Sequence, residues 1–123
     1  TTEIYTLSLH DALPIYELTQ MASLGLGMLN RALTAFIQED PHSASAIPLE
    51  DDAVDYLYNL VQHKVVDAMF ADPNIIDTAN LILWVAHNLE RLADRVTNIC
   101  ERTLFIATGE LMEMDSTDDE ENQ

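Results

Sequence analysis

The chain has 123 residues, of which 48% are hydrophobic, and its 22 acidic and five basic residues give a formal net charge of −17. This length suits one small domain, and the acidic balance argues against nucleic acid or an anionic membrane surface as a partner. No apolar run approaches the length of a membrane-spanning helix, so we expect no direct membrane insertion. The single cysteine, Cys100, cannot form an internal disulfide, which suits a cytoplasmic protein.

Residues 1–15 resemble, codon by codon, the in-frame translation of a common short-read sequencing adapter. A secretory signal peptide is the alternative, but the segment has no basic start, and Glu3, His10 and Asp11 interrupt any apolar stretch. We therefore interpret residues 1–15 as an artefact, expect the true protein to be truncated there, and place the domain at residues 16–108.

The first predicted element is a helix from Tyr16 to Glu39, which Pro41 ends. Its apolar residues recur at helical spacing: Leu18, Met21, Met28, Leu29, Ala32 and Phe36. Gly25 and Gly27 either weaken this helix locally or let a neighbouring helix approach closely. Residues 41–48 (PHSASAIP) have the composition of a loop.

Two further helices are predicted downstream. The second runs from Leu49 to Ala71, ahead of a tight turn at Asp72-Pro73-Asn74, with an apolar side formed by Val54, Leu57, Val61, Val65 and Ala68. The third runs from Ile75 to Thr108, with Gly109 as its C-terminal cap and an apolar stripe of Leu89, Leu92, Val96 and Ile99. Residues 109–123 form an acidic tail that we expect to be disordered.

These elements predict an all-α fold. Apolar and polar residues nowhere alternate over the length of a useful strand. Three helices in succession favour an antiparallel three-helix bundle. Helices of about 23 and 33 residues would span about 35 and 50 Å at 1.5 Å per residue, so the bundle should be elongated.

Two carboxylate pairs stand out on the predicted helices. Glu90 and Asp94 are four residues apart, as are Asp51 and Asp55, so each pair lies on one helical face. The pairs lie about equally far from the turn at Pro73, which places them level in an antiparallel hairpin, on the polar sides of their helices. Mutual repulsion opposes such an alignment unless cations screen or bind the charges.

Carboxylate oxygens favour hard cations such as magnesium, calcium, manganese or iron. Asn98, Glu101 and His87 are close enough along the third helix to supply further ligands or to orient the first ones. The alternative is an ordinary solvated acidic face in a chain that is acidic throughout. The spacing alone leaves both interpretations open.

The usual catalytic constellations are missing, so we expect no enzyme. The Glu-x-x-His spacing of ferritin-like di-iron enzymes occurs only from Glu39 to His42, and Pro41 interrupts it. There is no glycine-rich phosphate loop and no activated nucleophile, and Cys100 fits a small buried residue. Arginines on one flank of the third helix should pair with acidic neighbours, with phosphate capture as the alternative: Arg91, Arg95 and Arg102.

Residues 87–101 (HNLERLADRVTNICE) resemble the E-R-I-G-D-x-x-x-N-I-x-E helix of the PhoU-type phosphate-transport regulators. Residues 50–58 (EDDAVDYLY) are similar to the D-x-x-x-D segment of that family. The likeness covers the chain from Tyr16 to about Gly109. At a position where the family has glycine, this chain has Ala93.

The resemblance implies a six-helix, ferritin-helix-like protein made of two three-helix repeats, of which this chain holds one, the C-terminal one to judge from its acidic tail. It also implies that each repeat binds a metal, in some members as a multinuclear cluster, with iron in some members and manganese or magnesium in others. The residues that match the metal-binding motifs are Asp51, Asp55, Glu90 and Asp94, together with Asn98 and Glu101.

The function that the resemblance implies is regulatory. Family members limit phosphate uptake and repress the phosphate-starvation response, as adaptors between the ATPase subunit of the phosphate ABC transporter and a sensor histidine kinase. The missing repeat would leave apolar surface uncovered, so we expect a homodimer. The alternative function is a metal-free helical module whose acidic face contacts basic protein surfaces.

Overall fold

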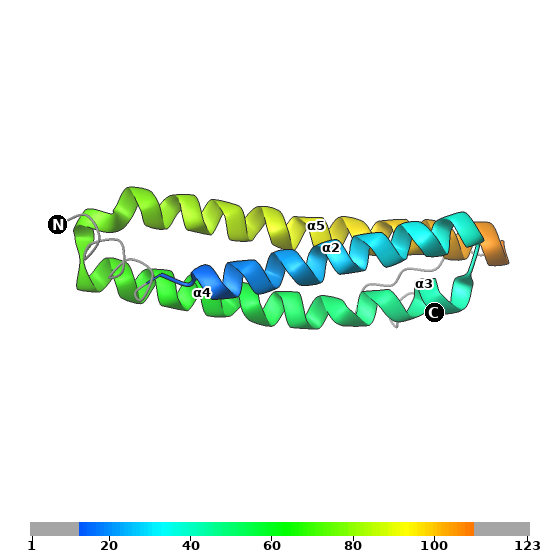
Figure 1. Ribbon diagram of the computed structural model, residues 1–123, viewed down its shortest axis with the longest axis horizontal. Helices are drawn as coiled ribbons and strands as arrows, with labels where there is room; N and C mark the ends of the chain where they lie inside the picture. The colour runs from blue at the N-terminus through cyan, green and yellow to red at the C-terminus, as the bar shows by residue number, and fades with distance from the viewer. Residues whose placement is uncertain (1–12, 110–123) are drawn as a thin grey trace, which may run out of the picture.

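Three long helices lie side by side along the length of the molecule (Figure 1). The computed structural model describes residues 13–109, and no strand occurs among them. The predicted boundaries lie within two residues of the long helices observed, which are α2 (Ile15–Gln38), α4 (Asp51–Ala71) and α5 (Ile76–Thr108). The all-α bundle is therefore confirmed. Residues 1–12 of the adapter-like segment and residues 110–123 of the acidic tail lie outside the described range.

The predicted loop at residues 41–48 is wrong. The chain forms a short helix, α3 (Pro41–Ala46), and a 3₁₀ turn, η1 (Ile47–Glu50), before α4 begins. The side chain of Asp40 accepts hydrogen bonds from the backbone N–H groups of His42 and Ser43, at 3.1 and 3.2 Å. Pro41 occupies the first helical position, where its missing N–H group is no loss. A good N-terminal cap therefore outweighs a loop-like composition.

The other helix ends follow the sequence prediction. The carboxylate of Asp72 accepts a hydrogen bond of 3.1 Å from the backbone N–H of Asn74, which starts the 3₁₀ turn η2 (Pro73–Ile75) between α4 and α5. Gly109 ends α5 in the left-handed conformation, with φ of 77°, and its N–H donates to the carbonyl of Phe105 at 2.8 Å.

The core lies between the three long helices. The predicted apolar side of α4 is buried without exception. On α5 the most buried residues are small, among them Ala86, Ala93 and Cys100, and the larger Leu89 and Ile99 are only partly buried at the edge of the core. Because α5 is covered by both α2 and α4, small residues at its centre let both neighbours approach. The predicted apolar stripe therefore lies to one side of the face of α5 that is most deeply buried.

Two ion pairs join the helices within the described range. Nζ of Lys64 on α4 donates to Oε1 of Glu17 on α2 at 2.7 Å, and Glu17 is only 9% exposed. Near the other end, the guanidinium of Arg31 on α2 binds the carboxylate of Glu50 in η1. None of the described helices is long and apolar enough to cross a membrane.

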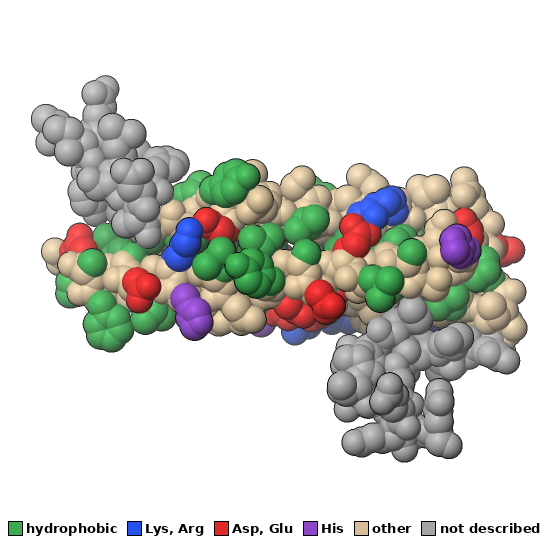
Figure 2. Space-filling model, turned by 90° about the horizontal axis from the view of Figure 1, so that it is seen from below, with side chains coloured by type: hydrophobic (Ala, Val, Ile, Leu, Met, Phe, Trp, Pro, Cys, Tyr) green, Lys and Arg blue, Asp and Glu red, His purple; other side chains and the backbone are tan. Residues whose placement is uncertain are grey.

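The surface retains many large apolar side chains. Figure 2 shows hydrophobic side chains spread along one face, with the few Lys and Arg side chains on that face lying beside acidic ones. Phe36, predicted to lie on the apolar period of α2, is 44% exposed because Ala32 and Ala35 take the buried positions. The most exposed apolar side chains include those of Phe70, Ile37, Leu49, Tyr56, Leu81 and Trp84.

Candidate functional site

A groove of about 620 Å³ runs between the start of α4 and the middle of α5. All six residues predicted as metal ligands line it: Asp51, Asp55, Glu90, Asp94, Asn98 and Glu101. The remaining lining residues are Pro48, Leu49, Asp52 and Thr97. The groove thus brings together the two carboxylate pairs, one from each helix, at the same height along the bundle.

The helical hairpin explains this placement. α4 and α5 run antiparallel from the turn at Pro73, so residues equally far from that turn face one another. Asp51 is the first residue of α4 and follows η1 directly, while Asp55 lies one turn further on. Glu90 and Asp94 are likewise one turn apart in the continuous helix α5. Regular helix geometry and one tight turn are therefore sufficient to position the four carboxylates.

The electrostatics of the groove centre on Asp51. Burial is the largest of the effects that together raise the pKa of Asp51 to about 6, and the negative charges of Asp55, Asp94, Glu90 and Asp52 contribute the rest, in that order of importance. Its Oδ1 atom is buried and has no hydrogen-bond partner among residues 13–109. A buried acceptor without a partner is costly unless a cation or a proton satisfies it.

Glu90 is affected in the same way. Burial raises the pKa of Glu90, as do the charges of Asp94 and Asp55, whereas His87 acts in the opposite direction. The groove therefore carries negative charge that its own residues do not neutralise. Such a site attracts cations and disfavours the ionised form of its most buried carboxyl group.

The donor set fits a hard cation. Every polar side chain in the groove offers oxygen, and the unpartnered Oδ1 of Asp51 is the kind of ligand that Mg²⁺, Mn²⁺ or Fe ions accept. However, within residues 13–109 no group of three or more His, Cys, Asp or Glu side chains stands ready to hold a metal ion. Repulsion between like charges favours side-chain rotamers that keep the carboxylates apart, so binding would require them to turn inwards.

Sequence reasoning placed His87 near the ligands and missed two polar residues. His87 does not line the groove; its ring lies 6.4 Å from that of Trp84, centroid to centroid. Asp52 and Thr97 do line it. Thr97 lies three residues after Asp94, on the same helical face, so the spacing carried a signal for it.

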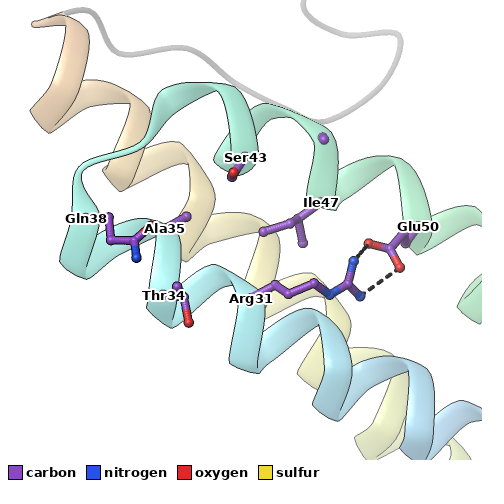
Figure 3. A pocket seen from close by; sticks show the side chains of 8 residues that line it. Arg31, Thr34, Ala35, Gln38, Ser43, Ile47 and Glu50 are labelled. Carbon is purple, nitrogen blue, oxygen red and sulfur yellow. Dashed lines mark hydrogen bonds and ion pairs between the residues drawn. The ribbon is translucent and has the colours of Figure 1, made fainter.

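A second pocket, of about 290 Å³, lies between the end of α2, α3 and η1 (Figure 3). Arg31 spans its edge: both terminal nitrogens bind the carboxylate of Glu50, one of them at 2.8 Å, and Nε donates to the carbonyl of Gly27 at 3.1 Å. The other lining residues are Thr34, Ala35, Gln38, Ser43, Ala46 and Ile47. Because its only strong charges neutralise each other, this pocket offers no free charge to a ligand.

Comparison with known proteins identifies the fold family. The family model described as "PhoU domain" matches residues 18–103. The "Phosphate-specific transport system accessory protein PhoU homolog" of Caulobacter vibrioides is 36% identical over 108 residues, covering 85% of this chain and 47% of the relative. The protein of the same name from Streptococcus pneumoniae is 33% identical over 98 residues, covering 80% of this chain and 45% of the relative.

The likeness extends to an archaeal protein, "PhoU homolog 1" of Methanothermobacter thermautotrophicus, which is 32% identical over 97 residues. The chain spans about half the length of the curated relatives that it matches. No solved structure matches it significantly. Since the family model covers most of the helical region and the relatives agree with it, the chain belongs to the PhoU domain family.

Proposed function

We propose that this chain is part of a negative regulator of phosphate uptake and of phosphate-starvation signalling. In this proposal the protein acts in the cytoplasm as a helical adaptor between the ATPase subunit of a phosphate ABC transporter and a sensor histidine kinase, and it forms a homodimer. Membership of the PhoU domain family supports the general function, and so do the names of its relatives, which are accessory proteins of phosphate-specific transport systems.

The groove between α4 and α5 is the proposed metal site. Asp51, Asp55, Glu90 and Asp94 would hold the ion, with Asn98 and Glu101 as further oxygen donors at one end. A bound divalent or trivalent cation, or a multinuclear cluster of iron, manganese or magnesium, would neutralise the groove and cross-link the two helices. Without it, the four carboxylates repel one another across the α4–α5 interface.

One observation carries this proposal. Oδ1 of Asp51 is buried and unpartnered at the point where the charges of Asp55, Asp94 and Glu90 converge on it. A surface acidic face would leave each carboxylate solvated, with ordinary pKa values. Asp51 instead has a pKa raised to about 6 by its burial and by the neighbouring carboxylates, which supports a site that lacks a compensating positive charge.

Elemental analysis tests the metal site. Protein purified without chelators should carry iron, manganese or magnesium in stoichiometric amounts. The double variant Asp55→Ala, Glu90→Ala should lose the metal while its far-ultraviolet circular dichroism stays helical. The double variant Asp67→Ala, Asp77→Ala removes two exposed carboxylates outside the groove and should keep the bound metal. Equal metal content in the wild type and the groove variant would refute the site.

The regulatory function is tested separately in a bacterium that lacks its own PhoU-type protein. Expression of the full-length gene that contains this domain should lower phosphate uptake, measured with radioactive phosphate. The same gene with the groove variant should lower uptake less. Uptake that is unaffected by the wild-type gene would contradict the proposed function whatever the metal content.

A metal-free interaction module is the second candidate. It is favoured by the absence, within residues 13–109, of a ready-made coordination group and by the many exposed apolar side chains. The two candidates differ in their response to chelation. If binding to the transporter ATPase subunit, measured by calorimetry, is unchanged after treatment with EDTA, the metal-free module is correct; if binding is weakened and manganese restores it, the metal-binding adaptor is correct.

A further inference from the structure

The basic residues of the chain differ in whether they are paired. Three of them are exposed on α5 and form no ion pair with any residue between 13 and 109: Arg91, Arg95 and Arg102. The expected pairing of these arginines with acidic neighbours on the helix is therefore wrong. The other two form ion pairs between elements: Lys64 with Glu17, and Arg31 with Glu50. The second of these pairs lies next to the groove, because Glu50 directly precedes Asp51 in the chain.

The turn η1 forms a wall that the pocket and the groove share. Ile47 and Glu50 line the pocket of about 290 Å³ on the side of α2. Pro48 and Leu49 line the groove of about 620 Å³, as does Asp51, the first residue of α4. The Cα atoms of consecutive residues are only about 3.8 Å apart, so a shift of Glu50 moves Asp51 with it. A contact made on the pocket side of η1 therefore affects the groove.

Few local contacts hold η1 and the start of α4 in place. Glu50 immediately precedes α4, but within the described residues its side chain makes no capping hydrogen bond to that helix. Hydrogen bonds in a 3₁₀ turn have poorer geometry than those in an α-helix. Of the four residues of η1, only Ile47 is buried. The position of Asp51 therefore depends on contacts from other elements.

Arg31 supplies such a contact from α2 (Figure 3). Both terminal nitrogens of its guanidinium bind the carboxylate of Glu50, and Nε donates to the carbonyl of Gly27 at 3.1 Å, one turn earlier in α2. The bond to Gly27 fixes the plane of the guanidinium, so that its two outer nitrogens face the two oxygens of Glu50. The pair thus joins η1 to α2 in one defined geometry.

We propose that Arg31 is a positioning residue for the metal site: by binding Glu50 it holds Asp51 in the groove, and it thereby raises the affinity of the groove for a cation. This inference rests on the metal site proposed above and extends it from α4 and α5 to α2. Arg31 itself does not contact the ion, since its side chain lines the pocket and not the groove. A site whose ligands are held in place loses less conformational freedom when the ion binds.

Asp51 is the groove carboxylate that most needs such support. The other three lie inside continuous helices: Asp55, Glu90 and Asp94. Asp51 stands at a helix end, where repulsion from these charges favours its movement out of the groove. A cation reverses that repulsion, so the cation and the Arg31–Glu50 pair favour the same position of η1. By linkage, each strengthens the other by the same factor.

A calorimetric titration of the full chain with Mn²⁺ tests the proposal. Arg31→Gln should raise the Kd about two- to fivefold, the range that a partly exposed ion pair can supply. If Arg31 acted only through its charge, its loss would instead make the groove more negative and lower the Kd. Arg31→Lys conserves the charge but not the paired geometry, and its Kd should lie between those of the wild type and Arg31→Gln.

Lys64→Gln is the matched control, because it also removes one positive charge and one ion pair between helices. Lys64 lies nine residues after Asp55, about 14 Å along α4, beyond the Debye length of about 8 Å at 0.15 M salt. This variant should therefore keep the wild-type Kd even though it leaves Glu17 without its partner. Circular dichroism shows that each variant is folded.

The possible outcomes separate this inference from the metal site itself. A wild type that binds Mn²⁺ while Arg31→Gln binds it equally well or more tightly would overturn the positioning role and leave the metal site standing. Equal weakening by Arg31→Gln and Lys64→Gln would also overturn it, because general loss of stability would then explain both. If the wild type does not bind Mn²⁺, Fe²⁺ or Mg²⁺, the metal site and the positioning role both fail.

Discussion

Gly25 on α2 lies directly against Leu92 on α5: a β-carbon on Gly25 would come within 3.1 Å of Cδ2 of Leu92. Gly25 is buried, and α2 packs against α5 over much of its length. Of the two interpretations that the sequence left open for this glycine, close approach of a neighbouring helix is therefore the correct one. Gly27, by contrast, would place a β-carbon near only the flexible end of Arg31, at 3.6 Å.

This difference predicts opposite outcomes for two glycine substitutions. Gly27→Ala should raise the free energy of unfolding by about 0.5 to 1 kcal/mol, because alanine is the better helix former and has room. Gly25→Ala should gain less or lose stability, since Leu92 must move by a few tenths of an ångström. Urea denaturation measures both. In a Leu92→Ala background, Gly25→Ala should raise the free energy of unfolding as Gly27→Ala does. An equal gain at the two glycines in the wild-type background would show that the helices do not meet at Gly25.

The sequence predicted the long helices well because their signals are local. The helical spacing of the apolar residues defines α4, and every residue of its predicted apolar side is buried. Asp72 and Pro73 end this helix. The connection before α4 was misjudged, because the Asp40 cap competes with a composition rich in loop-forming residues. The centre of the α5 core was also misplaced. Its position depends on where α2 crosses, and no local pattern encodes a crossing point.

In the candidate site, too, local spacing was predictable from the sequence and tertiary packing was not. The alignment of Asp51, Asp55, Glu90 and Asp94 was predictable from their distances to one turn, because helices are regular. The burial of Asp51 was not, since it depends on η1, which delivers Pro48 and Leu49 to the edge of the groove. Tertiary contacts, not spacing, therefore decide which of the four carboxylates is most perturbed.

The raised pKa of Asp51 predicts how stability depends on pH. In the folded chain this carboxyl group holds its proton up to about pH 6, whereas its ordinary pKa is 3.8. Its contribution to stability is complete below about pH 4 and is lost as the pH rises through 6, so the metal-free protein should be less stable at pH 7.5 than at pH 5. Because the side chain is partly exposed, we expect a difference of about 1 kcal/mol. Glu90 acts in the same direction.

Chemical denaturation of chelator-treated protein at the two pH values measures this difference. Asp51→Asn should reduce this difference and should stabilise the protein at pH 7.5, because it removes a partly buried negative charge from among four others. Asp67→Asn, at an exposed position on α4, should leave the difference unchanged. A wild-type protein that is more stable at pH 7.5 than at pH 5 would contradict the assignment.

Cys100 should be unreactive in the folded protein. The thiol is fully buried, and burial, with a smaller contribution from the charge of Glu101, raises its pKa to about 11. At pH 8 the thiolate is therefore rare, and labelling by a disulfide reagent should be slower than in urea-unfolded protein by on the order of 100-fold. Equal rates in the folded and unfolded states would mean that the end of α5 opens readily.

The two ion pairs should differ in energy and in their response to salt. The side chains of Arg31 and Glu50 are 52% and 33% exposed, so a double-mutant cycle with Arg31→Gln and Glu50→Gln should give a coupling energy of about 0.5 to 1 kcal/mol. Sodium chloride at 0.5 M should weaken it, because water reaches both groups. Arg31→Lys should keep less than half of this coupling energy, since lysine cannot bind both carboxylate oxygens in one plane.

Lys64 and Glu17 provide the matched comparison. The side chain of Glu17 is only 12% exposed, so Lys64→Met leaves a buried carboxylate without its partner and should lower the free energy of unfolding by about 1 to 3 kcal/mol. The loss should be nearly independent of salt, because counterions do not reach Glu17. If salt instead weakened both pairs equally, the carboxylate of Glu17 would have to be hydrated, and α2 and α4 would be separated at that height.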